Sequence, residues 1–279
     1  MPEGREIANQ TFVHKKSKYA AVAITMAALV LLTGYSLFMK YRQTLDLNRF
    51  GKIVEVLTDN SDLILAVLLL VFTVLPFYFV FDRRRAQARD LVPVAFMAAL
   101  CVAGRAAFAV IPLPNFKPVS AIIIITGISF GPECGYLTGA LAGFLSNFLF
   151  GQGPWTPWQM FCWGMIGLLA GILYRIGIFG SVGRQTVDRI GKRKKPVRLC
   201  IFGFLCGIGY GWVMNLYYLI GYVDPLNVYT IAAAYASSLL FDISHGVCTA
   251  MVLWFVGDTW TRKLLRIRRK FGIAGGKEG

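Results

Sequence analysis

The sequence has few of the groups that enzymes and nucleotide-binding proteins use. Charged residues make up only 15% of its 279 residues, and there are two histidines. It contains no GxxxxGK[ST] phosphate-binding loop, no HExxH zinc motif and no acidic pair suited to hydrolysis. These absences exclude ATP binding in the P-loop manner and lead us to expect no enzymatic activity.

The cysteines likewise give no indication of disulfide bonds or of a metal site. The six cysteines are scattered, none forms a CxxC pair, and most lie in apolar stretches, where cysteine packs as a small hydrophobe. The sequence therefore predicts no disulfide framework, no metal site and no cofactor.

Apolar residues, in contrast, dominate the chain. They make up 56% of it, and the mean hydropathy is +0.59, outside the range of soluble globular proteins. The apolar runs predict an all-α integral membrane protein with eight spans, approximately at Tyr19–Met39, Asp62–Phe81, Leu91–Ile111, Pro118–Phe130, Cys134–Phe150, Trp158–Phe179, Val197–Tyr222 and Val228–Val256.

The basic segment Asp82–Asp90 separates the first two predicted spans from the other six. We therefore divide the chain into an N-terminal extension (residues 1–90), a six-helix core (91–256) and a basic cytoplasmic tail (257–279). The span before the FGPECG turn reaches only about 18 Å at the helical rise per residue, against a hydrocarbon core of roughly 30 Å. Such a short element requires other helices to cover it, or a cavity that it lines.

The distribution of basic residues predicts the orientation. With eight spans, 23 of the 29 Lys and Arg residues fall on the side of the two termini, five fall on the opposite side, and Arg105 lies within a span. Because cytoplasmic loops are rich in Lys and Arg, both termini are expected in the cytoplasm of a cell-membrane protein. The lipid bilayer accounts for the net charge of +15, and no nucleic-acid partner is expected.

The first core span carries two features. Its alanines recur every four residues and form a small-residue stripe, which favours close helix packing, either within this chain or with a second membrane subunit: Ala95, Ala99, Ala103 and Ala107. Arg105 lies toward the outer end of the same span. A guanidinium there must be paired, reach outward, or meet an anionic or amide group of a ligand.

Two loops are expected at the external mouth of the core. The first is Pro-rich and contains Asn115, Phe116 and Lys117. The second, GQGPWTPWQ, follows Asn147 and contains Trp155, Trp158 and Gln159. Rigid aromatic residues beside amides suit a flat, partly polar organic ligand, although an interfacial aromatic belt has the same composition.

The last two spans contain further polar residues. Asn215 and Tyr218 lie in the outer half of the fifth core span. Asp242 and His245 are three residues apart in the sixth, which places them on one helix face, either as a structural pair or as a proton relay.

On these residues the core resembles the substrate-binding S components of energy-coupling factor (ECF) vitamin transporters. The resemblance covers Leu91–Val256 and rests on the six short spans, the alanine stripe, the block KPVSAIIIITGISFGPECGYLTGALAGFLSN and the FDISHG of the last span. The FGQGPWTPWQMF loop is similar to a subgroup associated with cobalamin or related uptake. The two additional N-terminal spans depart from the usual six.

The resemblance implies a function and partners. S components capture a vitamin outside the cell and associate with a membrane T component and two ATPase subunits. The small-residue stripe of the first core span faces the T component. The resemblance places the substrate site at Asn115–Lys117, Asn147, Trp155, Trp158, Asn215 and Tyr218; to these we add Arg105 and Gln159. The alternative is a proton-coupled carrier of a small organic solute that uses Asp242 and His245.

Overall fold

A computed structural model of the chain describes residues 30, 34, 88–180, 182–183 and 195–273. The chain divides into two compact units, Met1–Ala86 and Gln87–Gly279. Apart from Val30 and Gly34, the described residues belong to the second unit. The predicted spans Tyr19–Met39 and Asp62–Phe81 lie outside the described residues, save for these two helical positions.

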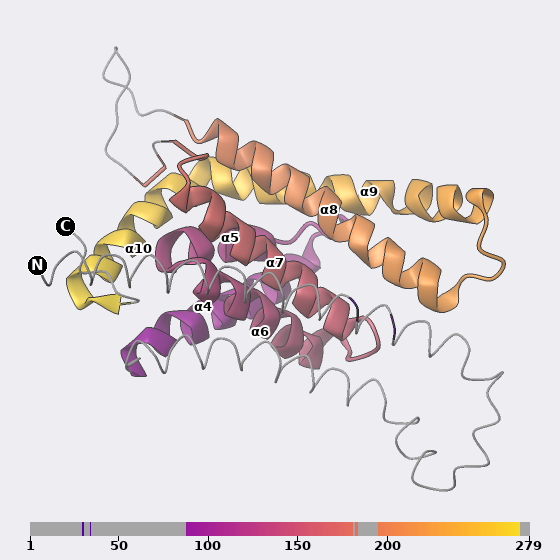
Figure 1. The fold of residues 1–279 in the computed structure, drawn as a ribbon, viewed down its shortest axis with the longest axis horizontal. Helices are drawn as coiled ribbons and strands as arrows, with labels where there is room; N and C mark the ends of the chain where they lie inside the picture. Colours follow the sequence, from indigo (N-terminus) through magenta and orange to yellow (C-terminus); the bar gives the residue numbers. More distant parts are fainter. Residues whose placement is uncertain (1–29, 31–33, 35–87, 181, 184–194, 274–279) are drawn as a thin grey trace, which may run out of the picture. The chain divides into compact units, whose positions relative to one another are not determined.

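The described part of the second unit is helical and contains no strand (Figure 1). Its elements are α4 (Ala88–Ala107), the 3-10 turn η3 (Phe108–Val110), α5 (Val119–Phe130), α6 (Pro132–Phe150), α7 (Thr156–Arg175), α8 (Val197–Tyr222), α9 (Val228–Val252), the π-helical turn η4 (Leu253–Gly257) and α10 (Asp258–Phe271). Four stretches are long and apolar enough to cross a membrane by length and composition: Asp90–Val110, Thr156–Arg175, Val197–Tyr222 and Val228–Phe271. These helices confirm the predicted all-α membrane fold.

Helix α5 is the centre of the unit. All of its 12 residues are buried, and it packs against α4, α6, α7, α8, α9 and α10. Its sequence, VSAIIIITGISF, is apolar around the whole circumference, as expected of a helix that other helices surround. A helix too short to span the bilayer is therefore covered by protein along its whole length.

Helices α5 and α6 are separated only by Gly131, whose φ of 109° lies in a region that favours glycine. Pro132 then begins α6, a position where a missing N–H costs nothing. Helices α6 and α7 approach so closely that their backbones touch. A Cβ on Gly139 would lie 2.2 Å from the carbonyl oxygen of Trp163, and one on Gly167 would lie 2.2 Å from that of Gly135.

Helices α8 and α9 form a hairpin that runs past the end of α4–α7 (Figure 1). They touch at Gly207, where a Cβ would lie 2.4 Å from the Cα of Gly246. Few of their side chains are buried, and large apolar ones such as Leu205 and Leu240 are exposed. Exposed apolar side chains on this hairpin are consistent with contact with lipid.

Two features near the basic loops differ from the sequence-based expectation. The fourth core span was expected to run from Trp158 to Phe179, but α7 ends at Arg175, because Gly177 (φ 81°) and Gly180 (φ 64°) adopt left-handed conformations that end a helix. The segment expected as a tail contains the ordered helix α10, which continues from α9 through η4 and packs on α5.

The contact between α6 and α7 predicts the effect of a single methyl group. Gly139→Ala should destabilise the protein by about 1–3 kcal/mol, because the new Cβ cannot fit against the backbone of Trp163. Thermal unfolding of the purified protein in detergent measures this as a lower Tm. The control is Gly209→Ala in α8, where no atom lies within 4 Å of an added Cβ. It should leave Tm unchanged or slightly raised, since alanine favours a helix. Equal Tm values for the two variants would contradict the close approach.

Candidate functional site

Arg105 on α4 is held by α6. Its Nη1 donates hydrogen bonds to Ser146 Oγ and, at 2.7 Å, to Asn147 Oδ1. Its guanidinium carbon also lies 4.5 Å from the ring centroid of Phe150 and 5.3 Å from that of Trp163. Among the described residues no carboxylate forms an ion pair with Arg105. Hydroxyl, amide and aromatic groups therefore hold this positive charge without neutralising it.

Asn147 extends the contact from α6 to α7. Its side chain is buried, and its Nδ2 donates to Thr156 Oγ1 at 2.8 Å and to Gln159 Oε1 at 2.9 Å. Thr156 Oγ1 in turn accepts from the backbone N–H of Gly153 at 3.2 Å. The predicted residues Arg105, Asn147 and Gln159 thus form one hydrogen-bonded chain, which fixes the loop between α6 and α7.

Lys117 adds a second positive charge from the loop before α5. Its Nζ lies 5.1 Å from the ring centroid of Phe150, the ring that Arg105 also approaches. Burial and the neighbouring Arg105 guanidinium hold the pKa of Lys117 below its usual range. Two cations at one phenyl ring favour a ligand with anionic or carbonyl oxygen atoms.

The loop that carries Lys117 is ordered against the end of α4. Asn115 has a positive φ of 52°, and its carbonyl accepts from the N–H of Lys117 at 2.8 Å. Phe116 stacks on Phe108, with ring centroids 6.3 Å apart. The predicted residues Asn115, Phe116 and Lys117 therefore form a tight turn. From this turn Lys117 reaches the group that we call the Arg105 cluster: Arg105, Lys117, Asn147, Phe150, Gln159, Trp163 and Tyr210.

The two predicted tryptophans differ in position. Trp158 is fully buried, and its ring centroid lies 5.7 Å from that of Tyr217, whereas Trp155 is 38% exposed in the loop.

Two aromatic residues near Arg105 were not predicted. Trp163 stacks on Tyr210 at 5.3 Å, and Tyr210 lies close to both Arg105 and Gln159. Trp163 follows Gln159 by four residues, a helical spacing that could have identified it; Tyr210 has no comparable sequence signal.

Asp242 and His245 both pack against α8, and His245 also contacts α5. His245 Nε2 lies 2.8 Å from Ser120 Oγ of α5, and its ring lies edge-on to Tyr210 at 4.9 Å. Asp242 accepts from Ser238 Oγ at 3.1 Å, and its carboxyl group packs where a Cβ on Gly211 of α8 would otherwise lie. No hydrogen bond joins the two side chains in the described structure.

Asn215 and Tyr218 belong to the hairpin rather than to the Arg105 cluster. Asn215 Nδ2 donates to Ser238 Oγ, so that Asn215, Ser238 and Asp242 form a polar link between α8 and α9. Tyr218 is exposed and stacks on Tyr222 at 6.2 Å. No described contact joins either residue to Arg105.

The alanine stripe of α4 lies on an exposed face. All four of its residues, Ala95, Ala99, Ala103 and Ala107, are exposed, while Val94, Met97, Ala98 and Cys101 on the other side of the helix are buried. The stripe is therefore not used for packing among the described helices.

The string Gly127–Gly131 matches the GxSxG pattern of nucleophile elbows, but its surroundings do not fit one. An elbow requires a strand followed by a helix, whereas this string is the end of α5. Ser129 is fully buried, and its Oγ has no hydrogen-bond partner among the described residues.

An all-helical membrane protein with an unneutralised cationic and aromatic cluster between its helices has the features of a solute-binding subunit. A family model described as "ECF-type riboflavin transporter, S component" matches residues 85–256. The match covers more than half of the chain, and the chain belongs to this family. Its class is a transporter component rather than an enzyme class. The resemblance to ECF S components is thus confirmed; the cobalamin-related subgroup is not, because the matching description names riboflavin.

Curated relatives are more distant. A UPF0397 protein of Vibrio atlanticus (strain LGP32) is 27% identical over 130 residues, which is 45% of this chain and 68% of the relative. A UPF0397 protein of Aliivibrio salmonicida (strain LFI1238) is 27% identical over 175 residues, or 61% of this chain and 88% of the relative. No solved structure matches the chain.

The contact between His245 and Ser120 predicts a loss of stability. Ser120→Ala should cost about 1–3 kcal/mol, because the buried His245 Nε2 loses its hydrogen-bond partner. The control is Ser237→Ala, which removes an exposed hydroxyl from the same helix as His245. Thermal unfolding in detergent should show a lower Tm for Ser120→Ala alone. The same Tm in both variants would mean that this hydrogen bond does not hold α5 to α9.

Proposed function

We propose that this chain is the S subunit of an ECF-type transporter and captures a flavin or a similar flat vitamin at the Arg105 cluster. The cluster consists of Arg105, Lys117, Asn147, Phe150, Gln159, Trp163 and Tyr210. Family membership supports the class of transporter. The observation that carries the site is that Arg105 and Lys117 share the Phe150 ring, while no described carboxylate pairs with either.

The chemistry of the cluster fits a flat, carbonyl-rich ligand. Arg105 uses only Nη1 for its described hydrogen bonds to Ser146 and Asn147. Arg105 and Lys117 supply donors for carbonyl oxygen atoms or ring nitrogens. Trp163 and Phe150 offer ring faces for stacking. A flavin ring system is flat, so it can stack on these rings, and it has carbonyl oxygens and ring nitrogens that can accept from these donors. The cobalamin assignment, in contrast, rests on the likeness of the GQGPWTPWQ loop alone.

Uptake requires partners that this chain does not replace. The sequence contains no phosphate-binding loop, so ATP hydrolysis must come from other subunits. We propose that a membrane T component docks on the exposed alanine stripe of α4 and that two ATPase subunits bind to the T component. Small side chains let a partner helix approach closely, which is how membrane helices gain contact energy.

The proposed orientation places both termini in the cytoplasm and the Arg105 cluster toward the outside. The positions of the basic residues support it, since the loop between α7 and α8 and the helix α10 are rich in Lys and Arg. The proton-coupled alternative receives less support. Asp242 and His245 share no hydrogen bond in the described structure; Asp242 packs on α8, and His245 contacts α8 and α5. These contacts suit a role in holding helices together rather than in passing a proton along α9.

The first test is a titration of riboflavin into the purified protein, followed by quenching of flavin fluorescence. Arg105→Gln should weaken binding about tenfold or more, the loss typical of a hydrogen bond to a charged group. The control is Arg198→Gln, an exposed arginine whose described contact is with Ile178 O at 3.4 Å. Equal weakening by both variants would contradict the site. A wild-type protein that neither contains nor binds riboflavin would contradict the flavin assignment.

The second test concerns docking. Ala99→Leu should reduce co-purification of T and ATPase subunits while leaving riboflavin affinity unchanged, because the leucine keeps a partner helix away from α4 without touching the cluster. Ala233→Leu on α9, also exposed, is the matched control and should co-purify normally. Normal subunit recovery with Ala99→Leu would contradict docking on the stripe. Loss of riboflavin binding as well would indicate a folding defect.

A further inference from the structure

Helix α10 carries a dense positive charge that the proposed function does not use. Its 14 residues, DTWTRKLLRIRRKF, include six basic residues and one acidic residue: Arg262, Lys263, Arg266, Arg268, Arg269, Lys270 and Asp258. A surplus of this size repels itself unless an anion compensates for it.

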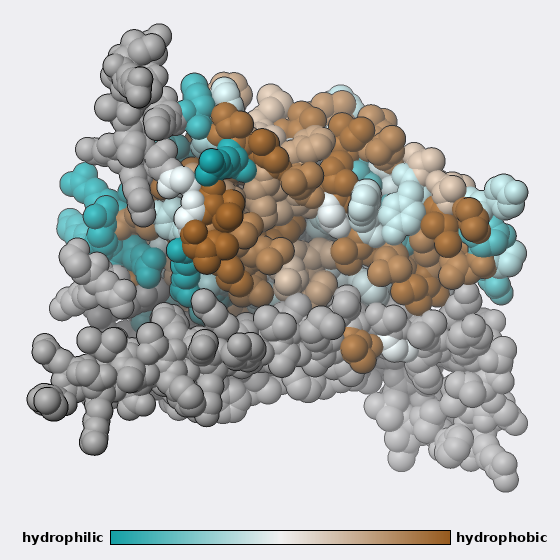
Figure 2. Space-filling view, turned by 45° about the horizontal axis from the view of Figure 1, so that its top comes forward, coloured by the Kyte–Doolittle hydropathy of each residue, from teal (hydrophilic) through white to brown (hydrophobic). Residues whose placement is uncertain are grey.

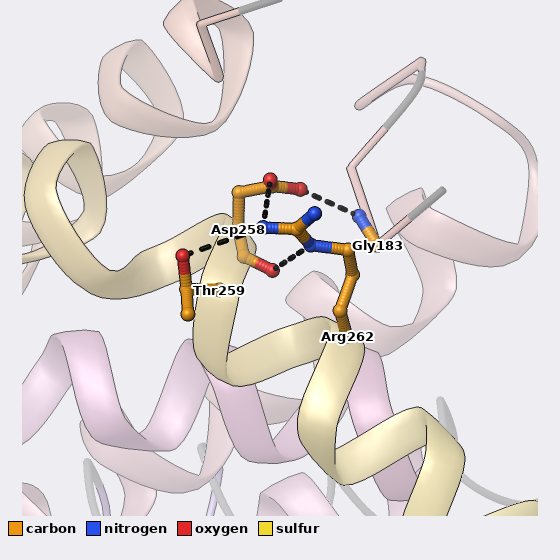
Figure 3. Close-up of polar contacts among 4 residues, drawn as sticks. All are labelled: Gly183, Asp258, Thr259 and Arg262. Atoms are coloured by element: carbon orange, nitrogen blue, oxygen red, sulfur yellow. Dashed lines mark hydrogen bonds and ion pairs between the residues drawn. The ribbon is translucent and has the colours of Figure 1, made fainter. Parts of the chain in front are cut away.

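Two of the basic residues face the protein. Arg262 Nη2 lies 3.2 Å from Asp258 Oδ2, and Asp258 Oδ1 accepts from the backbone N–H of Gly183 at 3.0 Å (Figure 3). Arg268 Nη1 donates to Ser129 O near the C-terminal end of α5 at 3.4 Å. These hydrogen bonds therefore attach α10 both to the turn after α7 and to the central helix α5.

The other four basic residues are exposed: Lys263, Arg266, Arg269 and Lys270. None of them forms an ion pair with a described residue. Ile267 and Phe271, which are 41% and 53% exposed, follow Lys263 at successive four-residue intervals, which places the three on one helix face. The exposed surface of α10 thus combines cations with apolar side chains, as interfacial helices do.

The position of α10 matches a membrane surface. It continues from α9 through η4 as the last part of the stretch Val228–Phe271, whose 44 residues are about twice the number that a bilayer requires, so the charged end at α10 extends beyond the hydrocarbon core. Trp254 in η4, four residues before α10 begins, is 39% exposed and has Lys195 Nζ 5.2 Å from its ring centroid, an arrangement common at the headgroup level. Figure 2 shows hydrophilic residues gathered at the α10 end of the molecule, beside a broad hydrophobic surface over the adjacent helices.

We propose that the exposed face of α10 binds the phosphate headgroups of anionic phospholipids. Ile267 and Phe271 enter the edge of the acyl region, while Lys263, Arg266, Arg269 and Lys270 contact the phosphates. Because α10 is fastened to α5 and to the turn at Gly183, bound lipid holds this end of the bundle at the headgroup level. This proposal does not depend on which vitamin the chain binds.

The test uses the full-length purified protein and native mass spectrometry in detergent that contains equal phosphatidylglycerol and phosphatidylcholine. The wild-type protein should retain phosphatidylglycerol preferentially. The quadruple variant Lys263→Gln, Arg266→Gln, Arg269→Gln and Lys270→Gln should lose this preference by about tenfold, because the charges that attract the headgroups are gone. The matched control keeps the charge by exchanging Lys for Arg and Arg for Lys at the same four positions, and it should retain the lipid.

Three results would overturn the proposal. Unchanged phosphatidylglycerol retention in the quadruple variant would place the lipid elsewhere. Equal displacement by millimolar inorganic phosphate would indicate a site for soluble anions. Unchanged retention together with lost co-purification of T and ATPase subunits would indicate a protein partner on α10. If the quadruple variant does not fold, the double variant Lys263→Gln and Arg266→Gln is judged by the same criteria, while riboflavin binding by either variant tests the proposed function separately.

Discussion

The structure depends on the burial of one short helix. Helix α5 is too short to cross a bilayer, and its ends would expose backbone groups to lipid if other helices did not surround it. Its neighbours meet this requirement by close approach: glycines of α6 and α7 bring the two backbones into contact beside it. Ser120 and Ser129 at opposite ends of α5 contact His245 and Arg268, so the last span and α10 are positioned from the same helix.

The same packing explains how an arginine is tolerated between membrane helices. Arg105 is held by Ser146, Asn147 and two aromatic rings rather than by a carboxylate, so its positive charge remains available. With Lys117 at the same phenyl ring, the cluster has donors but no described acid, and a ligand that brings acceptor atoms would relieve the repulsion between the two cations. This balance is the physical basis for proposing the substrate site there.

The two ends of the unit therefore present different surfaces, to which the two proposals assign different partners. One end has the Arg105 cluster and the turn that contains Lys117, and the other has α10 with its exposed cations. Between them, α4 presents a stripe of small residues and the α8–α9 hairpin presents large apolar ones. A subunit that captures a solute, contacts a second membrane protein and remains oriented in the bilayer needs surfaces of these three kinds.

The sequence by itself determined the membrane class and the six core helices to within a few residues, because the length of an apolar run and the residues of a turn act locally. It also determined the family, through motifs that can be recognised without a structure. It also predicted Arg105, Asn147 and Gln159 as candidate site residues, since polar residues in or beside apolar runs are conspicuous. Only the tertiary structure decided which of them meet. Trp163 and Tyr210 join Arg105, while Asn215 and Tyr218 belong to the hairpin. It also separated Asp242 from His245 and revealed α10 as a helix, because helix rotation and helix–helix contact arise from packing that no local spacing specifies.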